Sequence, residues 1–337
     1  MNIKMLYTTK NFKLIGDYKK FEFIQFKVTD DPRHKESLIS PIFLQYFGKK
    51  GLDELNDGPV FYAEHPLNTK NTSHLEEDEI DQMNTSNESS IQHLNNLLHF
   101  TWFIRDNNVD GKVLYTQAAE SIGEKPNGHR ISTCGGDIAT PHVITVEELE
   151  HAKKLYIKYS FKCRPGELEA PDPSKPTPPF FRKIEIQPFS YSTQKKVEDL
   201  NKISRAIMFL TYARNAPSLP TKISFHVCLY ECLFSNNENT EITHKIAERI
   251  AFYMGRDASS KKGIFRLVKT AYAIRSKVFR GQLIDPKLWS NIISISNEID
   301  ELSRKVLLKI LNTDIEKFTP LEPEILSQYF TDLLFGS

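Results

Sequence analysis

The apolar residues of this chain change their spacing near residue 193. Before this point they recur at every second position in short runs, as in β-strands. After it they recur every three to four positions, as on one face of an α-helix. Because one regular element cannot follow both periods, the two parts must fold differently. We predict an α+β fold in two domains, with a mixed, β-rich N-terminal region at 1–192 and an all-helical bundle at 193–337.

Short runs rich in aromatic and β-branched residues predict strands in the first part of the chain. These runs lie at 21–28, 59–64, 112–117, 154–161 and 183–192. The acidic, Asn- and Ser-rich stretch 68–90 predicts a mobile loop, and apolar spacing over 91–102 predicts a helix after it. Thr145 and Glu148 match a capping box, which predicts a second helix there.

Six prolines lie within 163–180 and exclude a helix or a central strand from that segment. We interpret it as a long loop close to the domain boundary. An insertion within one domain is an equal alternative, because the strand-like run 183–192 follows it.

Apolar stripes and end signals predict a series of helices in the second part. The predicted helices lie at 197–210, 221–235, 241–255, 264–281, 288–310 and 322–334. Gly255 and Gly281 supply C-terminal ends. Asp285 and Pro286 offer an N-cap and a proline at the first helical position. This pattern is typical of a helical bundle.

Charge and cysteine content limit the classes of function. The formal net charge is +1, which excludes a generally basic surface, so contact with nucleic acid requires a local patch. Four cysteines do not form a disulfide framework, which fits a reducing compartment. The N-terminus lacks the apolar stretch of a signal peptide, and no run approaches the roughly 18 apolar residues of a membrane span. We therefore expect a cytoplasmic protein without a membrane partner.

Two blocks of the helical part carry a more specific pattern. Residues 230–255 read YECLFSNNENTEITHKIAERIAFYMG, and residues 271–281 read AYAIRSKVFRG. They resemble the Apea-like HEPN family of prokaryotic defence proteins, in which a helical glutamate and a stretch similar to "eithklaeRiA" precede a tyrosine, two residues and "RSKxxHG". The resemblance covers about 195–315. The matching residues are Glu231, Glu248, Arg249, Tyr272, Arg275, Ser276, Lys277 and Gly281.

The resemblance implies metal-independent RNA cleavage through an Arg-x4–6-His motif, with two protomers pairing their motifs in a homodimer. An imidazole near neutral pKa exchanges the proton of a ribose hydroxyl, and a guanidinium stabilises the phosphate charge. No cofactor and no metal are implied. Carried onto this chain, the catalytic positions are Glu231, Arg275 and Arg280, and the RNA-binding positions are Arg266, Lys269, Tyr272, Ser276 and Lys277.

Glu231 has two interpretations. It is either a solvated glutamate or a buried polar partner of Arg275, and the resemblance favours the partner. The basic stretch 261–280 has two interpretations as well. A charge run is usually a solvated face, but the helical spacing of its cations also suits a phosphate backbone.

Arg280 stands where the family has its histidine. Arginine has no acceptor lone pair and stays protonated, so it cannot act as a general base. In one interpretation the natural protein is a toxin-type or antiviral ribonuclease, and this copy carries a disabling His→Arg change. In another, the domain is naturally non-catalytic and binds RNA or a protein through Arg275, Lys277 and Arg280. In a third, His226 or His244 replaces the missing base.

A zinc site is the alternative use of His226, Cys228 and Cys232. The two cysteines share a helix face, but no second ligand pair of matching spacing is evident. Free cysteine is among the most buried residue types, so a core position is favoured. We predict no metal site.

The first part of the chain matches no family pattern that we can assign. Gly135 and Gly136 are interpreted as a turn, because no GxGxxG or Walker pattern follows them. We expect the region 1–192 to sense a signal or to gate the helical domain.

Overall fold

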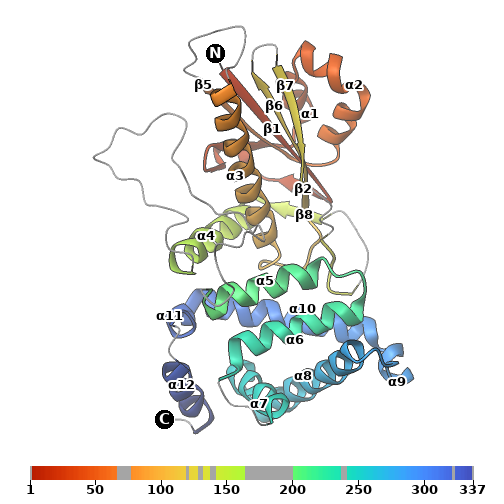
Figure 1. Cartoon of the computed structure of the whole chain (residues 1–337), viewed down its shortest axis with the longest axis vertical. Helices are drawn as coiled ribbons and strands as arrows, with labels where there is room; N and C mark the ends of the chain where they lie inside the picture. Colours follow the sequence, from red (N-terminus) through yellow and green to blue (C-terminus); the bar gives the residue numbers. More distant parts are fainter. Residues whose placement is uncertain are drawn as a thin grey trace. The chain divides into compact units, whose positions relative to one another are not determined.

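The computed structural model describes residues 2–66, 77–118, 121–127, 132–136, 142–163, 200–236, 241–320 and 323–335 (Figure 1). The chain is divided into two compact units. The N-terminal unit comprises Met1–Ile131, Ala139–Phe161 and Pro165–Ser190. The helical unit comprises Ser132–Ile138, Lys162–Arg164 and Tyr191–Ser337.

A six-stranded antiparallel sheet organises the N-terminal unit, in the order β3-β4-β5-β1-β6-β7. Its strands are β1 (Asn2–Lys10), β3 (Glu22–Phe23), β4 (Phe26–Thr29), β5 (Val60–Pro66), β6 (Asp110–Ala118) and β7 (Ser121–Pro126). A separate parallel pair joins β2 (Phe12–Ile15) to β8 (His142–Thr145). The predicted mixed fold, with a sheet in the first part of the chain followed by helices, is confirmed at this level.

The middle of central strand β1, from Met5 to Thr9, is buried on both faces. Leu6 belongs to an apolar cluster with Phe43 and Leu55 of helix α2 (Pro41–Asn56). The next residue, Tyr7, points to the other face and donates its hydroxyl hydrogen bond to Asn95 of helix α3 (Glu77–Thr101). Helices therefore cover both faces of the sheet. The other helices here are η1 (Tyr18–Lys20), α1 (Pro32–Leu38) and α4 (Val146–Cys163).

Several predictions for the N-terminal unit need correction. The run 154–161, predicted as a strand, lies in α4. Its apolar residues fit a helical stripe that begins at the capping box, where Thr145 and Glu148 exchange hydrogen bonds of 2.9 and 3.2 Å. The predicted loop 68–90 is helical from Glu77 onward, and its first part lies outside the described residues. The buried stripe of α4 comprises Leu149, Ala152, Leu155, Tyr156, Tyr159 and Cys163.

The run 21–28, predicted as one strand, forms a hairpin. Phe23 of β3 pairs with Phe26 of β4 across a two-residue turn. Ile24 occupies this turn with φ 59°, a left-handed conformation that β-branched residues rarely adopt. Strand β1 was not predicted, and the predicted strand 183–192 lies outside the described residues.

The helical unit follows the predicted sequence of helices closely. It contains α5 (Lys202–Arg214), α6 (Leu219–Phe234), α7 (Ile242–Met254), α8 (Ala258–Phe279), α9 (Pro286–Ser290), α10 (Ile292–Lys309), the π-helical turn η3 (Ile310–Asp314), α11 (Ile315–Phe318) and α12 (Pro323–Phe335). Asp285 caps α9 with Pro286 at its first position, as predicted. The predicted helix 288–310 is divided at Asn291, which ends α9 and precedes α10.

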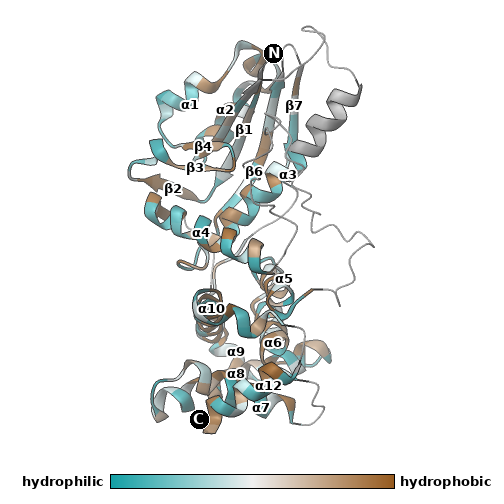
Figure 2. Ribbon diagram, turned by 90° about the vertical axis from the view of Figure 1, so that its left-hand side faces the viewer, coloured by the Kyte–Doolittle hydropathy of each residue, from teal (hydrophilic) through white to brown (hydrophobic). Residues whose placement is uncertain are grey.

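Helix α6 is the centre of the helical unit, because it contacts α5, α8 and α10. It is correspondingly apolar on several sides, and Val227, Leu229, Tyr230 and Leu233 are fully buried. The outer helices instead have one buried face and one polar face, which the hydropathy colouring lets the reader follow (Figure 2). In α10, for example, Ile299 and Val306 are buried while Glu301 and Lys305 are exposed.

No helix in the described parts of the chain is long and apolar enough to cross a membrane.

Candidate functional site

A two-point ion pair joins the central helix α6 to α8. Arg275 of α8 donates from Nη1 to Oε1 of Glu231 at 2.9 Å and from Nη2 to Oε2 at 3.0 Å. The side chains are 30% and 27% exposed, so the pair is half-buried. The expected partnership of these residues is confirmed. Bidentate geometry fixes the plane of the guanidinium, which a single contact would leave free to rotate.

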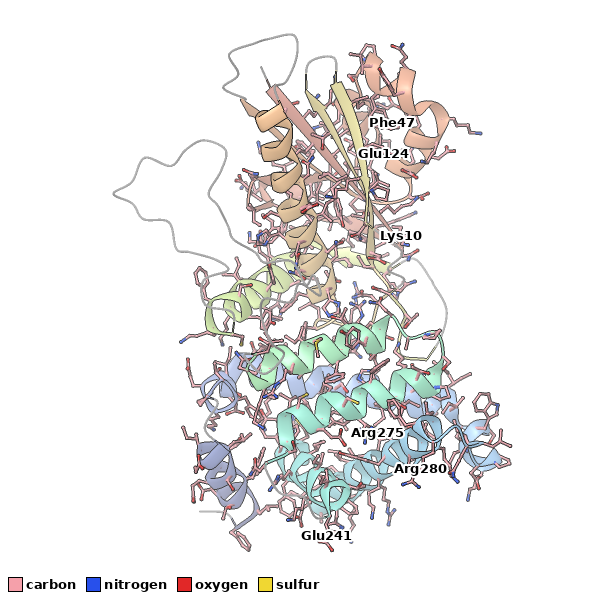
Figure 3. All side chains as sticks on the ribbon, viewed as in Figure 1. Lys10, Phe47, Glu124, Glu241, Arg275 and Arg280 are labelled. Carbon is pink, nitrogen blue, oxygen red and sulfur yellow. The ribbon has the colours of Figure 1, made fainter. Side chains whose placement is uncertain are left out.

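Helix α8 points Arg275 inward because of how its apolar residues are spaced. Asp257 starts the helix with a capping box to Ser260. Val268, Ala271 and Ile274 are then buried against the rest of the unit. Arg275 lies at the edge of this buried face, and Figure 3 labels it on the part of α8 beside α6.

Burial and charge act in opposite directions on Glu231. Burial raises the pKa of this carboxyl, and the Arg275 guanidinium opposes the rise. The same burial, together with the neighbouring Glu231 carboxylate, raises the pKa of the Tyr272 phenol well above its usual range. Burial also raises the pKa of the Cys228 thiol. Tyr272 and Cys228 therefore stay protonated near neutral pH, and the charges of this site are those of Glu231 and Arg275.

Aromatic rings cover the Arg275 guanidinium from its own helix. Its Cζ lies 5.5 Å from the centroid of the Phe279 ring and 6.0 Å from that of Tyr272. Phe279 is 62% exposed and lies one helical turn beyond Arg275. Phe279 was not among the predicted site residues. Its position four residues after an arginine on one helix is the sequence signal that could have identified it.

The remaining predicted RNA-binding residues lie on the opposite side of α8. Successive helical residues turn by about 100°, so Lys277 points about 160° away from Arg275, while Arg266, Lys269 and Lys277 fall within about 80° of one another. All three of these cations are exposed. We call Arg266, Lys269, Lys277 and Arg280 the basic row.

Arg280 closes the basic row as the C-cap residue of α8, with an exposed side chain (Figure 3). The turn that follows uses Gly281 at φ 64°, and Gln282 N donates to the carbonyl of Lys277 at 2.9 Å. The sequence-predicted catalytic group is therefore divided. One part contains the side chains of Glu231, Arg275 and Tyr272, which lie together. Half-buried Ser276 follows Arg275, and Arg280 lies at the end of the helix.

The two candidate substitute histidines differ in access. His226 is fully buried on α6, with Nε2 3.5 Å from Oδ1 of Asp300, so its imidazole is closed to an RNA hydroxyl in this conformation. His244 is exposed on α7, and its ring packs edge-on against Phe265 at 5.1 Å. Phe265 precedes Arg275 by ten residues, or about 15 Å of helix. Neither histidine is positioned as a partner of Arg275.

The cysteines of α6 pack as thiols. Cys228 and Cys232 are half-buried, and burial raises the pKa of Cys232 to about 11. Across the described residues no group of three or more His, Cys, Asp or Glu side chains could hold a metal ion. Buried His226 faces Asp300 on α10 and not these thiols.

A further residue of the motif, Arg249, contacts the end of α6 and α12. Arg249 of α7 is buried, donates to the carbonyl of Phe234 at 2.7 Å and lies 4.9 Å from the Phe330 ring. It thereby ties the end of α6 to α12. Its match to the family pattern is explained by packing.

No family model, no curated protein and no solved structure matches this chain.

Proposed function

We propose that the helical unit is an HEPN-type RNA-binding domain built as a metal-independent ribonuclease, in which Arg280 has replaced the catalytic histidine and disabled cleavage. The observation that carries the proposal is the two-point Glu231–Arg275 pair between α6 and α8, with residue 280 exposed at the end of the same helix. These are the positions that the resemblance assigns to the acidic residue, the arginine and the base.

Arg275 has the chemistry for a phosphate contact. Two of its five N–H donors bond to Glu231, and its side chain is 30% exposed, so part of it faces solvent. A guanidinium held in a fixed plane is already oriented when charge develops on a phosphate, so no reorganisation is needed at that moment. Arg280 adds a second cation but no proton acceptor.

The basic row supports RNA, a polyanion, as the ligand. Its four cations lie on one exposed side of α8 and at its end, and a polyanion gains from each phosphate that a cation neutralises. The chain as a whole has a net charge of only +1, so this local excess of cations stands out against a balanced remainder.

We also propose that two copies pair at this end of the helical unit. Large apolar side chains are exposed between residues 279 and 293, namely Phe279, Leu283, Trp289 and Ile293. Exposed apolar groups of this size mark interaction surfaces, and the resemblance implies a two-fold homodimer there. Light scattering of Leu283→Ser should then show a smaller mass than the native protein, whereas Phe335→Ser, equally apolar and exposed on α12, should not.

Installing the histidine tests the proposal directly. Purified Arg280→His should cleave a labelled RNA in the presence of EDTA, because an imidazole at this position supplies the missing proton acceptor. The unsubstituted protein, with Arg280, should bind the same RNA without cutting it. Circular dichroism and light scattering check that both proteins have the same fold and mass, so that a difference in cleavage is due to residue 280.

Other outcomes favour the other interpretations. An inert but folded Arg280→His that binds RNA would favour a naturally non-catalytic module, and one that binds no RNA would favour a protein-binding module. Cleavage by the native protein that disappears in His244→Ala would assign the base to His244. The setting we propose, a prokaryotic antiviral or toxin system acting in the cytoplasm, predicts that expression of Arg280→His is toxic to its host.

A further inference from the structure

A five-residue segment from the first part of the chain is built into the helical unit. Residues 132–136, which we call the strap, lie in sequence between β7 and β8 but belong to the helical unit. Thr133 anchors the strap to the end of α5, because its backbone N and its Oγ1 both donate to the carbonyl of Arg214, at 2.8 and 2.7 Å. The strap therefore packs as part of the helical unit.

A buried lysine of α6 holds the strap from the other side. Lys222 is 1% exposed, and its Nζ donates to the carbonyl and Oγ1 of Thr133 at 3.2 and 2.9 Å and to the carbonyl of Cys134. A buried ammonium is costly unless acceptors surround it. The strap supplies three of these acceptors, so its place in the unit and the charge of Lys222 stabilise each other.

The glycines of the strap allow a close approach to α10. Ser296 donates its hydroxyl hydrogen bond to the carbonyl of Gly135. A Cβ at Gly135 would lie 3.0 Å from Cβ of Asp300, and a Cβ at Gly136 would overlap the side-chain amide of Asn297. The sequence Gly135–Gly136 is therefore explained by packing on a helix, and not only by a turn.

The strap and the Glu231–Arg275 pair act on the same helix. Lys222 and Glu231 are nine residues apart on α6, or about 13.5 Å. Release of the strap removes three acceptors from Lys222 at one end of α6 while Glu231 at the other end positions Arg275. A rigid, closely packed helix transmits such a change because packed interiors do not deform continuously.

We infer that the strap is a conformational latch: docked, it fixes α6 and with it the Glu231–Arg275 pair, and undocked, it loosens both. The chain enters the strap after the first segment of the N-terminal unit, which ends at Ile131, and returns to that unit at Ala139. A signal received in the first part of the chain therefore reaches the site through the covalent chain. The regulatory meaning of the latch depends on the proposed function, but its effect on α6 does not.

Hydrogen exchange of the full chain tests the latch. Thr133→Val removes the hydroxyl that bonds to both Lys222 and Arg214 and keeps the side-chain shape. It should speed amide exchange in 228–234 about tenfold, the effect of losing about 1.4 kcal/mol. The control is Thr313→Val, an exposed threonine of the same unit whose hydroxyl donates to the carbonyl of Lys309. It should leave 228–234 unchanged.

A reversible lock gives the opposite perturbation. In a Cys134→Ser background, Gly136→Cys with Asn297→Cys places two thiols where the strap meets α10, and oxidation should lock the strap. Adding Thr133→Val to this protein should speed exchange in 228–234 only after reduction. Two results would overturn the latch. One is equal exchange of 228–234 in Thr133→Val and in the unsubstituted protein. The other is equal exchange of 228–234 in the oxidised and reduced forms of the double-cysteine protein that carries Thr133→Val.

RNA binding by the same proteins separates the latch from the proposed function. Weaker binding in reduced than in oxidised protein would support both. Changed exchange without any RNA binding would leave the latch standing and reject the proposed function. Unchanged exchange with salt-sensitive RNA binding would reject the latch and leave the proposed function standing.

Discussion

The two sides of helix α8 carry the same kind of charge in different settings. On the inner side, Arg275 is half-buried and fixed at two points by Glu231. On the outer side, the cations of the basic row are exposed. Exposed surface charges of this kind interact weakly and are screened by salt.

This difference assigns separate roles to residues that the sequence places side by side. A fixed guanidinium recognises one phosphate in one orientation, whereas exposed cations attract a polyanion without defining its register. Loss of the inner arginine should therefore affect chemistry and stability, and loss of the outer cations should affect affinity and its dependence on salt.

The largest expected effect is on the inner side. In the Arg280→His protein, adding Arg275→Ala should lower the rate of RNA cleavage about 100- to 1000-fold, because the transition-state charge loses a positioned donor. Adding Lys269→Ala instead should change the rate under saturating RNA only slightly. Single-turnover rates measure both. Equal losses from the two variants would show that the distinction between the sides of α8 is wrong.

Stability should separate the two sides as well. Glu231→Ala leaves the half-buried Arg275 without its carboxylate and should lower the free energy of unfolding by about 1–2 kcal/mol. Arg280→Ala, on an exposed side chain, should change it by less than about 0.5 kcal/mol. Urea unfolding followed by circular dichroism measures both values. A larger loss in Arg280→Ala would indicate a contact that the exposed position does not suggest.

Local end signals made much of the helical unit predictable. Asp285 with Pro286 and the glycine at 255 mark helix ends in the sequence because capping depends on the residue itself and its nearest neighbours. The run 154–161 misled the prediction because its residues alternate locally. Its apolar residues continue a stripe formed by Ala152 and Leu149, which lie one and two turns earlier in the same helix.

The candidate site was partly predictable for a related reason. Motif order suggested that Glu231 and Arg275 meet, and they do. The division of the cations between two sides of α8 follows from their helical spacing, whereas the place of Arg280 depends on where the helix ends. Lys222 gives no signal at all: in the sequence it is an ordinary lysine, and only the tertiary fold brings residues 133 and 134 to it from 89 and 88 positions away.

The basic row gives a smaller effect that depends on salt. Lys277→Ala with Arg280→Ala should weaken RNA binding about three- to tenfold near physiological salt. The slope of log affinity against log salt should fall by about 1.4, since each neutralised phosphate of a single strand contributes about 0.7. Fluorescence anisotropy at several salt concentrations measures this. An affinity loss with an unchanged slope would mean that these side chains contact bases or protein and not phosphates.

The smallest effect concerns which force dominates at Glu231. Burial raises the pKa of this carboxyl from its usual 4.5 in spite of Arg275. Between the pKa of Glu231 in the unfolded chain and its higher pKa in the folded protein, the folded state therefore binds more protons. The stability that this group contributes is complete below the unfolded pKa and is lost as pH rises through the folded pKa.

Glu231→Gln removes this titration and keeps the side-chain shape. The free energy of unfolding of the native protein minus that of Glu231→Gln should thus be larger near about pH 4 than near about pH 7. Urea unfolding at both pH values measures the difference, and Glu324→Gln, at an exposed position of α12, is the control. A difference that instead grows with pH would mean that attraction to Arg275 outweighs burial. The inner side of α8 would then be governed by its ion pair, and Glu231 would hold Arg275 more tightly near about pH 7 than near about pH 4.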